Sequence, residues 1–293
     1  MQYDVIIVGG SYSGMAAALQ LVRARRQVLI IDAGVRRNRF ARHSHGFIGQ
    51  DGISPDMIFK QARDQLIRYP TMHWHHGLAV QAKGSKDNFE VQLESGEIFR
   101  ARRVLFALGV EDCLPDTEGM SARWGKTVFH CPYCHGYELD QGDIAVIAAS
   151  DMSVHQAIMV SDWGRVTFFL NQQSEPAPEA LAALSERHIV IETSPLVRLS
   201  GEADIELQDG RVLSFAGVFT TPSTRPASDI AQRLGCQMEA TMTGTQIQCD
   251  STKETTISGA FACGDTARMP HSVSLAVGDG AWAGACIHRT LIF

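Results

Sequence analysis

The N-terminal stretch of this chain constrains its fold more than any other part. Asp4–Val8 is a short β-branched run, typical of a strand that is buried on both faces. The turn Gly9–Gly14 follows, and Met15–Arg26 is rich in Ala and Leu and predicts a helix. Gln27–Ile31 predicts the next strand. This order predicts a βαβ unit, and therefore an α/β domain built on a parallel sheet.

The turn of this unit has the spacing of a dinucleotide-binding site. Gly9 and Gly14 allow the backbone to approach a pyrophosphate at the helix N-terminus, and Asp32 ends the second strand where it can bind a ribose hydroxyl. Ser11 stands where the G-x-G-x-x-G pattern has its second glycine, with Gly10 beside it to help the turn. The alternative interpretation is an ordinary βαβ turn.

Cys131 and Cys134 are separated by two residues and flanked by His130 and His135. This spacing suits a redox dithiol, because the two sulfurs can close and reopen a small ring, and a helix N-terminus or an imidazolium can stabilise one thiolate. Three alternatives stay open at this point. They are covalent attachment of a c-type haem, a structural zinc site completed by two further ligands, and an inert buried pair.

Size and charge exclude several classes of function. The chain has 293 residues, which favours two domains. Its net charge of -6 gives no electrostatic support for nucleic-acid binding. No apolar stretch reaches the roughly 18 residues of a membrane span, and no signal peptide precedes the first strand. We therefore expect a cytoplasmic protein that binds neither nucleic acid nor membrane.

The pattern of the first half recurs without its chemistry. Asp143–Ala148, Met152–Val160 and Arg165–Leu170 predict a second strand–helix–strand unit, which suggests an internal duplication. Its first turn contains no glycine, and its second strand is followed by Asn171-Gln172-Gln173, with neither an acid nor an arginine. Residues 112–119 and 222–226, which contain prolines, are interpreted as linkers on either side of this unit.

Three further groups of residues carry weaker signals. Arg36–Arg42 is interpreted as a solvated loop, with contact to cofactor phosphates as the alternative. His73, His75 and His76 tempt a metal assignment, but no carboxylate or cysteine is near and strand alternation places only two of them on one face, so we expect no metal. The five cysteines outside the pair are interpreted as structural.

The chain ends with a strand that runs into Gly264-Asp265, followed by a glycine-bearing helix from about Ser272 to Leu291. Taken with the N-terminal glycine turn and a Cys-x-x-Cys just before the second unit, this order resembles the low-molecular-weight thioredoxin reductases over nearly the whole chain. The local sequence Cys-Pro-Tyr-Cys-His-Gly-Tyr-Glu resembles a divergent branch that includes the dithiol oxidases of the gliotoxin and holomycin pathways.

The resemblance implies two Rossmann-like (three-layer ββα) domains, with the second inserted into the first. Residues 1–112 and 226–293 would form a discontinuous FAD-binding domain, and residues 113–225 an NAD(P)-binding-like domain that carries the cysteines. It also implies a homodimer. The family's glycine-rich turn and its basic motif for NADPH are missing from the second domain, which leaves NADPH, NADH or no nicotinamide open.

Individual roles follow from the same resemblance. Cys131 would exchange with substrate, Cys134 would face the flavin, and His135 would act as acid and base with a pKa near neutral pH. The implied cofactor-binding residues are Gly9, Ser11, Gly14, Asp32, Asp265, His271 and Ser272. His271 and Ser272 fall near an Arg-Gln pair that the family places beside the flavin.

These expectations converge on an FAD-dependent dithiol–disulfide oxidoreductase that oxidises a small dithiol with oxygen or another acceptor. The first alternative is an NAD(P)H-dependent reductase of thioredoxin or a thioredoxin-like protein. The second alternative, from another class, is a non-catalytic FAD-binding redox sensor.

Overall fold

A computed structural model describes residues 2–293 and divides the chain into two compact units. Unit 1 consists of Met1–Arg39, Phe47–Glu111 and Arg225–Phe293. Unit 2 consists of Phe40–Gly46 and Asp112–Thr224. The assignment of residues 113–225 as an inserted nucleotide-binding domain stays a prediction. Within residues 2–293, no helix has the length and apolar character that crossing a membrane requires.

Unit 1 is built on a seven-stranded sheet in the order β3-β2-β1-β6-β5-β4, with β19 also pairing with β6. Parallel pairing joins β1, β2, β3, β6 and β19, whereas β4, β5 and β6 form an antiparallel meander. The bounds of these strands are β1 Gln2–Val8, β2 Val28–Asp32, β3 Met72–His76, β4 Ala79–Ser85, β5 Asn88–Leu93, β6 Ile98–Phe106 and β19 Ala260–Ala262. The predicted α/β architecture is confirmed.

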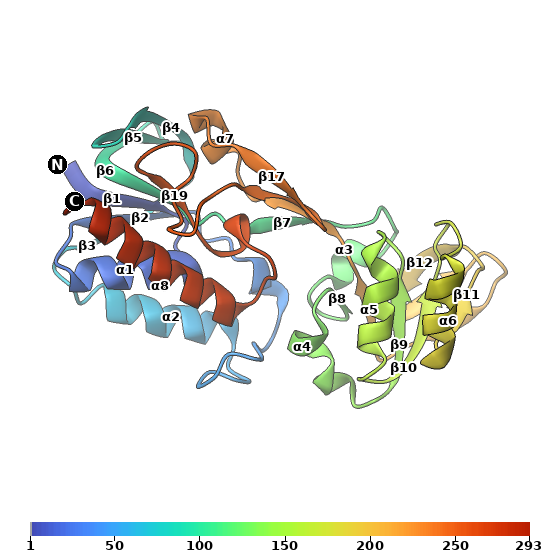
Figure 1. The fold of residues 1–293 in the computed structure, drawn as a ribbon. Coiled ribbons are helices and arrows are strands. Elements are labelled where there is room, and N and C mark those ends of the chain that lie inside the picture. The colour runs from blue at the N-terminus through green and yellow to red at the C-terminus, as the bar shows by residue number, and fades with distance from the viewer. Residues whose placement is uncertain (1) are drawn as a thin grey trace. The chain divides into compact units, whose positions relative to one another are not determined.

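Both faces of this sheet are covered. Helices α1 (Tyr12–Arg23), α2 (Pro55–Leu66) and α8 (Val273–Thr290) contribute apolar residues to the core on one face (Figure 1). The short helix α7 (Ile230–Leu234) packs on the other face. The expected helix Met15–Arg26 begins and ends three residues too late, because the helix starts directly after Ser11 and Arg25 adopts a positive φ of 60°.

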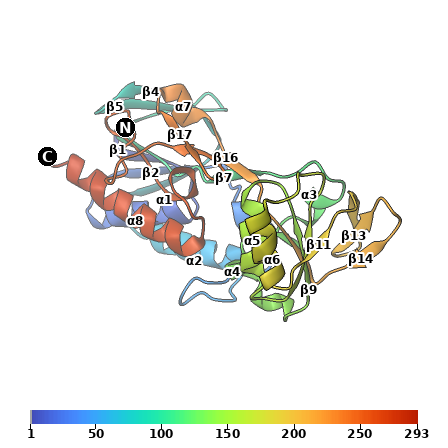
Figure 2. The same ribbon diagram turned by 45° about the vertical axis from the view of Figure 1, so that its right-hand side comes forward.

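Unit 2 contains a five-stranded parallel sheet in the order β11-β10-β9-β15-β8. Its strands are β8 Val128–Phe129, β9 Asp143–Ile147, β10 Arg165–Phe169, β11 Val190–Glu192 and β15 Gly217–Thr220. Helices α5 (Met152–Val160) and α6 (Pro178–Glu186) lie side by side on one face (Figures 1 and 2). The small sheet of β12 (Leu196–Ser200), β13 (Asp204–Leu207) and β14 (Val212–Ser214) covers the other.

The two expected linkers lie at the boundaries between the units, but they are not wholly irregular. Asp112 and Cys113 of the first linker and Ser223–Pro226 of the second belong to strands. β7 (Val110–Cys113) and β16 (Ser223–Pro226) are neighbours in a four-stranded sheet with β18 (Gly244–Ile247) and β17 (Met238–Thr241). An Arg225–Glu111 ion pair of 2.8 Å joins the two strands. Their backbone groups bond each other rather than water, a pairing between distant segments that local composition does not reveal.

Candidate active site

The glycine turn between β1 and α1 forms a tight cradle. Gly9 has a φ of +104°, and a side chain at Gly9 would collide with the carbonyl of Ala107. One at Gly14 would collide with the carbonyl of Gly9. Ser11 is the N-cap of α1, yet its side chain makes no capping hydrogen bond, and the first turn carries no acidic residue. This twelve-residue helix therefore presents backbone N–H groups that suit a phosphate.

Asp32 lies beside this cradle at the end of β2. Its Oδ1 accepts a hydrogen bond of 3.1 Å from the backbone N–H of Gly10. A side chain at Gly10 would come within 2.6 Å of the Trp74 ring and 2.8 Å of Asp32 Cβ. Gly10 thus allows Trp74 and Asp32 to approach the turn closely, a requirement that the motif spacing did not reveal.

The arginine-rich segment after β2 is only partly a solvated loop. Arg39, Phe40 and Arg42 are exposed, as that interpretation expects, whereas Arg36 and Arg37 are partly buried. The segment forms the 3-10 turn η1 (Arg37–Phe40), and the Arg37 side chain is only 18% exposed. One Arg37 nitrogen, Nη1, lies 3.2 Å from Asp265 Oδ2 and 2.9 Å from His271 Nδ1. The next residue, Asn38, donates to the hydroxyl of Tyr12 at 3.0 Å. This turn therefore connects the N-terminal and C-terminal parts of unit 1.

Asp279 fixes the Gly264-Asp265 segment from α8. Its Oδ2 accepts the backbone N–H of Gly264 at 2.8 Å, and its Oδ1 pairs with Lys253 Nζ at 2.7 Å. Gly264 has a φ of +73°, and a side chain there would meet Ser13 of α1. Asp279 is a buried positioning residue that the sequence analysis missed. The available signal was an acid between Gly278 and Gly280 in an otherwise apolar helix.

These residues fit FAD. The free N-terminus of α1 suits the pyrophosphate, and Asp32 is placed for the adenosine ribose. Buried acceptor atoms in the same unit, Asp265 Oδ1 and Asn38 Oδ1, have no hydrogen-bond partner among residues 2–293. Hydroxyl groups of a ribityl chain are donors that would satisfy them. Ser272 is the N-cap of α8 and accepts from Leu275 N at 3.1 Å, so its contact with the cofactor stays a prediction.

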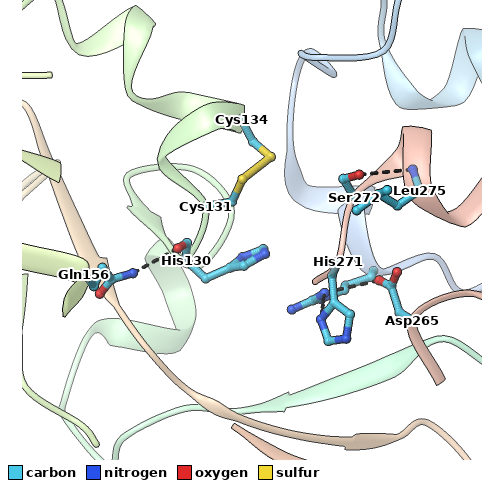
Figure 3. The surroundings of a disulfide bond; sticks show 9 residues. His130, Cys131, Cys134, Gln156, Asp265, His271, Ser272 and Leu275 are labelled. Carbon is cyan, nitrogen blue, oxygen red and sulfur yellow. Dashed lines mark hydrogen bonds and ion pairs between the residues drawn. A yellow bond between two sulfur atoms is a disulfide. The ribbon is translucent and has the colours of Figure 1, made fainter. Parts of the chain in front are cut away.

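The cysteine pair lies in unit 2, where Cys131 is the N-cap of the single-turn helix α4 (Pro132–His135). The two cysteines form a disulfide with a Cα–Cα distance of 5.4 Å (Figure 3). Pro132 occupies the first helical position, where its missing N–H costs nothing. Gln156 of α5 donates to the carbonyl of His130 at 2.9 Å and holds the chain just before Cys131.

His135 differs from the expectation in its protonation. Its ring stacks on Phe129 with centroids 4.1 Å apart and planes 17° apart. Burial, together with a smaller repulsion from His45, lowers the pKa of His135 from 6.5 to about 4. The expected pKa near neutral pH was therefore wrong. Burial against the Phe129 ring removes the water that would stabilise the charged imidazolium, so the neutral form is favoured. His45 itself lies 3.4 Å from Glu138 Oε1.

The glycine-free turn between β9 and α5 of unit 2 is closed by hydroxyl groups. Ser153 Oγ accepts hydrogen bonds from the backbone N–H groups of Ala149 at 2.9 Å and Ser150 at 3.1 Å. It also lies 2.9 Å from Thr221 Oγ1, which in turn lies 2.8 Å from Ser150 Oγ. The amides that would bind a pyrophosphate between β9 and α5 already have a partner from their own chain.

The remaining candidate ligands do not converge. No group of three or more His, Cys, Asp or Glu among residues 2–293 is arranged to hold a metal ion. Cys236, Cys263 and Cys286 are buried, and burial raises the pKa of each thiol, which makes these cysteines poor nucleophiles. Cys113 is exposed and Cys249 is partly buried.

Comparison with known proteins gives consistent results. A family model described as pyridine nucleotide-disulphide oxidoreductase matches residues 3–280. A thioredoxin reductase from Leptosphaeria maculans, sirT, is 29% identical over 98% of this chain and 93% of its own. The crystal structure of an oxidoreductase from Agrobacterium tumefaciens has a TM-score of 0.98 and 52% identity, covering 100% of this chain and 99% of that one. The crystal structure of HlmI has a TM-score of 0.93 and 30% identity, with 99% and 93% coverage.

Proposed function

Because this chain belongs to the pyridine nucleotide-disulphide oxidoreductase family, we propose that it is an FAD-dependent oxidase of small dithiols. Its similarity to proteins named thioredoxin reductase extends over nearly the whole chain, and it is a thioredoxin reductase-like flavin disulphide oxidoreductase. The direction of electron flow, the substrate and the roles of single residues are our proposal. A homodimer and a cytoplasmic location are part of that proposal and rest on the family resemblance alone.

The closed turn at Ser153 carries the assignment of direction. A reductase of this family needs a site where a reduced nicotinamide dinucleotide can bind. In unit 2 the two relevant amides bond to Ser153 Oγ, and Asp151 stands at the N-cap of α5 where it would repel a phosphate. A dinucleotide would have to displace these contacts and bind next to a carboxylate. Electrons supplied by a dithiol substrate avoid this requirement.

The cysteine pair accepts those electrons by thiol–disulfide exchange. A substrate thiolate attacks Cys131 Sγ, which breaks the Cys131–Cys134 bond, forms a mixed disulfide and leaves Cys134 as a thiolate. The second substrate thiolate attacks the substrate sulfur of the mixed disulfide, so the substrate leaves as a disulfide and Cys131 becomes a thiolate. Two electrons have then moved to the cysteine pair, and the two thiol protons have passed to nearby bases and water.

The chemistry after this exchange depends on the cofactor. A bound FAD would supply the two-electron acceptor that the reduced cysteine pair needs to return to the disulfide, with oxygen or another acceptor as the final oxidant. We assign Cys134 as the sulfur that hands the electrons on. His135 follows Cys134 directly. Its imidazole is neutral at pH 7, so it can accept a proton but cannot act as an imidazolium acid.

The second candidate function is an NAD(P)H-dependent reductase of a thioredoxin-like protein. It is favoured by the relatives that are named thioredoxin reductase. In this case the Ser153 contacts would have to open when the dinucleotide binds. The two candidates differ in which reductant reaches the flavin, and one experiment separates them.

The experiment is an anaerobic spectral titration of the FAD-loaded protein with dithiothreitol, NADPH and NADH in parallel. We expect dithiothreitol alone to bleach the visible flavin absorption, and air to restore it. Cys134→Ser should hold the flavin without being bleached, whereas Cys113→Ser, a change of an exposed cysteine outside the pair, should behave as the wild type. Bleaching by micromolar NADPH or NADH would overturn the oxidase and support the reductase. If FAD binds but none of the three reductants bleaches it, the non-catalytic FAD-binding sensor is the function that still fits.

A further inference from the structure

Arg37 contacts both Asp265 and His271 through one guanidinium nitrogen, and we propose that it is a positioning residue of the flavin site. It holds Asp265 and His271 in fixed orientations and supplies the positive charge beside them. The inference rests on the proposed use of FAD, but it concerns contacts that lie entirely within unit 1. It does not depend on the direction of electron flow or on the substrate.

The first argument comes from the hydrogens of Arg37. A guanidinium has only donors, so the His271 Nδ1 atom that lies 2.9 Å from Arg37 Nη1 must be an acceptor. The imidazole is then neutral, and its only N–H is on Nε2. Arg37 therefore selects one tautomer of His271 and aims a single donor. The positive charge at this place belongs to the guanidinium and not to the imidazole.

The second argument comes from the carboxylate of Asp265. Its Oδ2 pairs with Arg37 Nη1 at 3.2 Å, whereas its Oδ1 is buried and has no hydrogen-bond partner among residues 2–293. Buried carboxylate oxygens are costly to leave without a donor. The two oxygens of the carboxylate therefore have different roles: Oδ2 pairs with Arg37, and Oδ1 can accept a hydrogen bond from a ligand hydroxyl.

The third argument is that Arg37 is itself held in place. Asn38 anchors the turn to Tyr12, in the first turn of α1. Arg36 forms an ion pair with Asp56, and its guanidinium lies 4.2 Å above the centre of the Phe59 ring. The side chain of Arg37 is only 18% exposed. An arginine held in this way loses little additional freedom when a ligand binds, which is the requirement for a preorganised site.

The test compares the FAD dissociation constant and the flavin reduction potential of Arg37→Met, Arg37→Lys and the wild type. Arg39→Met is the matched control, since Arg39 is on the same turn, is exposed, and donates to the carbonyl of Arg36. We expect Arg37→Met to raise the dissociation constant at least about tenfold, the loss typical of a charge-assisted hydrogen bond, and to make the potential more negative. Arg37→Lys should recover most of the potential.

A double-mutant cycle with Asp265→Asn tests whether Arg37 acts through Asp265. We expect the effect of Arg37→Met on FAD affinity to shrink by more than half in the Asp265→Asn background. Nitrogen-15 spectra of the holoenzyme should show His271 as the Nε2–H tautomer only when Arg37 is present. Unchanged affinity and potential in Arg37→Met, full additivity in the cycle, or an equal effect of Arg39→Met would each overturn the inference.

The outcome can be separated from that of the proposed function. A wild type that takes up no FAD refutes the proposed function and this inference together, before any variant is made. A wild type that holds FAD but is not bleached by dithiothreitol refutes the oxidase only. Affinity, potential and tautomer are measured without substrate, so they still decide the role of Arg37.

Discussion

The imidazole of His135, which follows the second cysteine of the disulfide, stacks on the ring of Phe129 at a centroid distance of 4.1 Å. Burial there lowers the pKa of His135 to about 4. The residue that follows the cysteine pair is therefore neutral at pH 7. This arrangement has a measurable consequence for the stability of the protein.

We expect His135 to make the protein less stable as the pH falls from about 6.5 to about 4. The unfolded chain binds a proton on this histidine at the higher pKa of 6.5, whereas the folded protein does so only at about 4. Between these values the unfolded state binds more protons, so the free energy of unfolding rises with pH and falls with acid. At pH 4.5 the loss relative to pH 7.5 is on the order of 2 to 3 kcal/mol.

The measurement is urea unfolding at pH 7.5 and 4.5 for the wild type, His135→Gln and the control His155→Gln, which changes an exposed histidine on α5. The difference in unfolding free energy between the two pH values should be smaller in His135→Gln by about this amount, and equal to the wild type in His155→Gln. Carboxylates also titrate in this range, but equally in all three proteins. The same pH dependence in His135→Gln and wild type would refute the lowered pKa.

Ser153→Ala tests the closed turn of unit 2. The change removes the acceptor of two part-buried backbone N–H groups, so we expect a loss of about 2 kcal/mol in unfolding free energy. Ser161→Ala is the control at the other end of α5, where the hydroxyl donates to the carbonyl of Ile158 and should contribute less than about 1 kcal/mol. Urea midpoints of unit 2, followed by Trp163 fluorescence, compare the two. Equal small losses would show that Ser153 is not needed to close the turn.

Elements that depend on local pattern could be predicted from the sequence. Helix α5 spans Met152–Val160 as expected, and the strands on either side of it lie within one residue of the predicted ranges. Apolar runs bounded by turns determine such elements without distant partners. Gly9, Gly14 and Asp32 were also selected from their spacing, because the strand–turn–helix sequence with a following acid is specific to one local backbone geometry.

The parts that could not be predicted depend on partners far along the chain. Arg37 and Asp265 are separated by 228 residues, and nothing near Arg37 distinguishes it from the other arginines of the segment. The ends of β7 and most of β16 contain polar residues and a proline, which is why the sequence predicted linkers there. Their strand structure depends on pairing with each other, more than 100 residues apart in the chain. The neutral state of His135 depends on a ring stack that the sequence does not encode locally.

Lys253 and Asp279 form a largely buried ion pair, so removing the cation alone should cost more stability than removing the cation and neutralising the carboxylate together. Lys253→Met leaves the Asp279 carboxylate buried without its partner, and Arg268 is farther away at 3.8 Å, so we expect a loss of about 3 kcal/mol. Asp279→Asn in the Lys253→Met background should restore part of it, because a neutral amide can still accept from Gly264 N. FAD retention on dilution and urea midpoints both report the result. Additive losses in the double variant would contradict the pairing.

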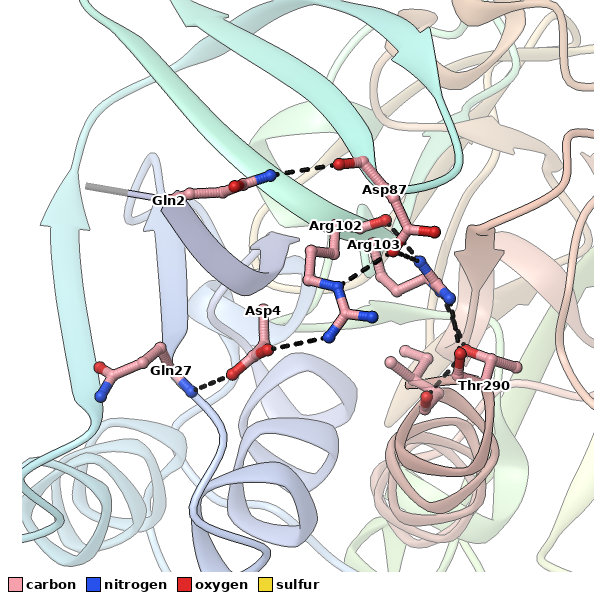
Figure 4. A network of polar contacts seen from close by, with 8 residues as sticks. Gln2, Asp4, Gln27, Asp87, Arg102, Arg103 and Thr290 are labelled. Carbon is pink, nitrogen blue, oxygen red and sulfur yellow. Dashed lines mark hydrogen bonds and ion pairs between the residues drawn. The ribbon is translucent and has the colours of Figure 1, made fainter. Parts of the chain in front are cut away.

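Arg103 should contribute more to the stability of unit 1 than its neighbour Arg102, although both bond to Asp87. Arg103 on β6 is 1% exposed and donates to Asp87 Oδ1 at 2.8 Å and to the carbonyl and hydroxyl of Thr290 at 2.6 and 3.0 Å (Figure 4). It thereby binds the C-terminal end of α8, where helix carbonyls lack partners within the helix. The Arg102 side chain is 37% exposed and pairs with the carboxylates of Asp87 and Asp4.

We expect Arg103→Met to cost about 3 kcal/mol, because it removes the guanidinium donors of the part-buried Thr290 carbonyl and hydroxyl and leaves Asp87 with one cation fewer. Arg102→Met removes a partly solvated pair and should cost less than about 1 kcal/mol. Release of FAD, followed by the rise in flavin fluorescence during a urea titration, reports the unfolding of unit 1 in each variant. Equal midpoints for the two variants would show that the bond to α8 contributes nothing beyond the shared ion pair, and that the end of the helix is held by its apolar contacts alone.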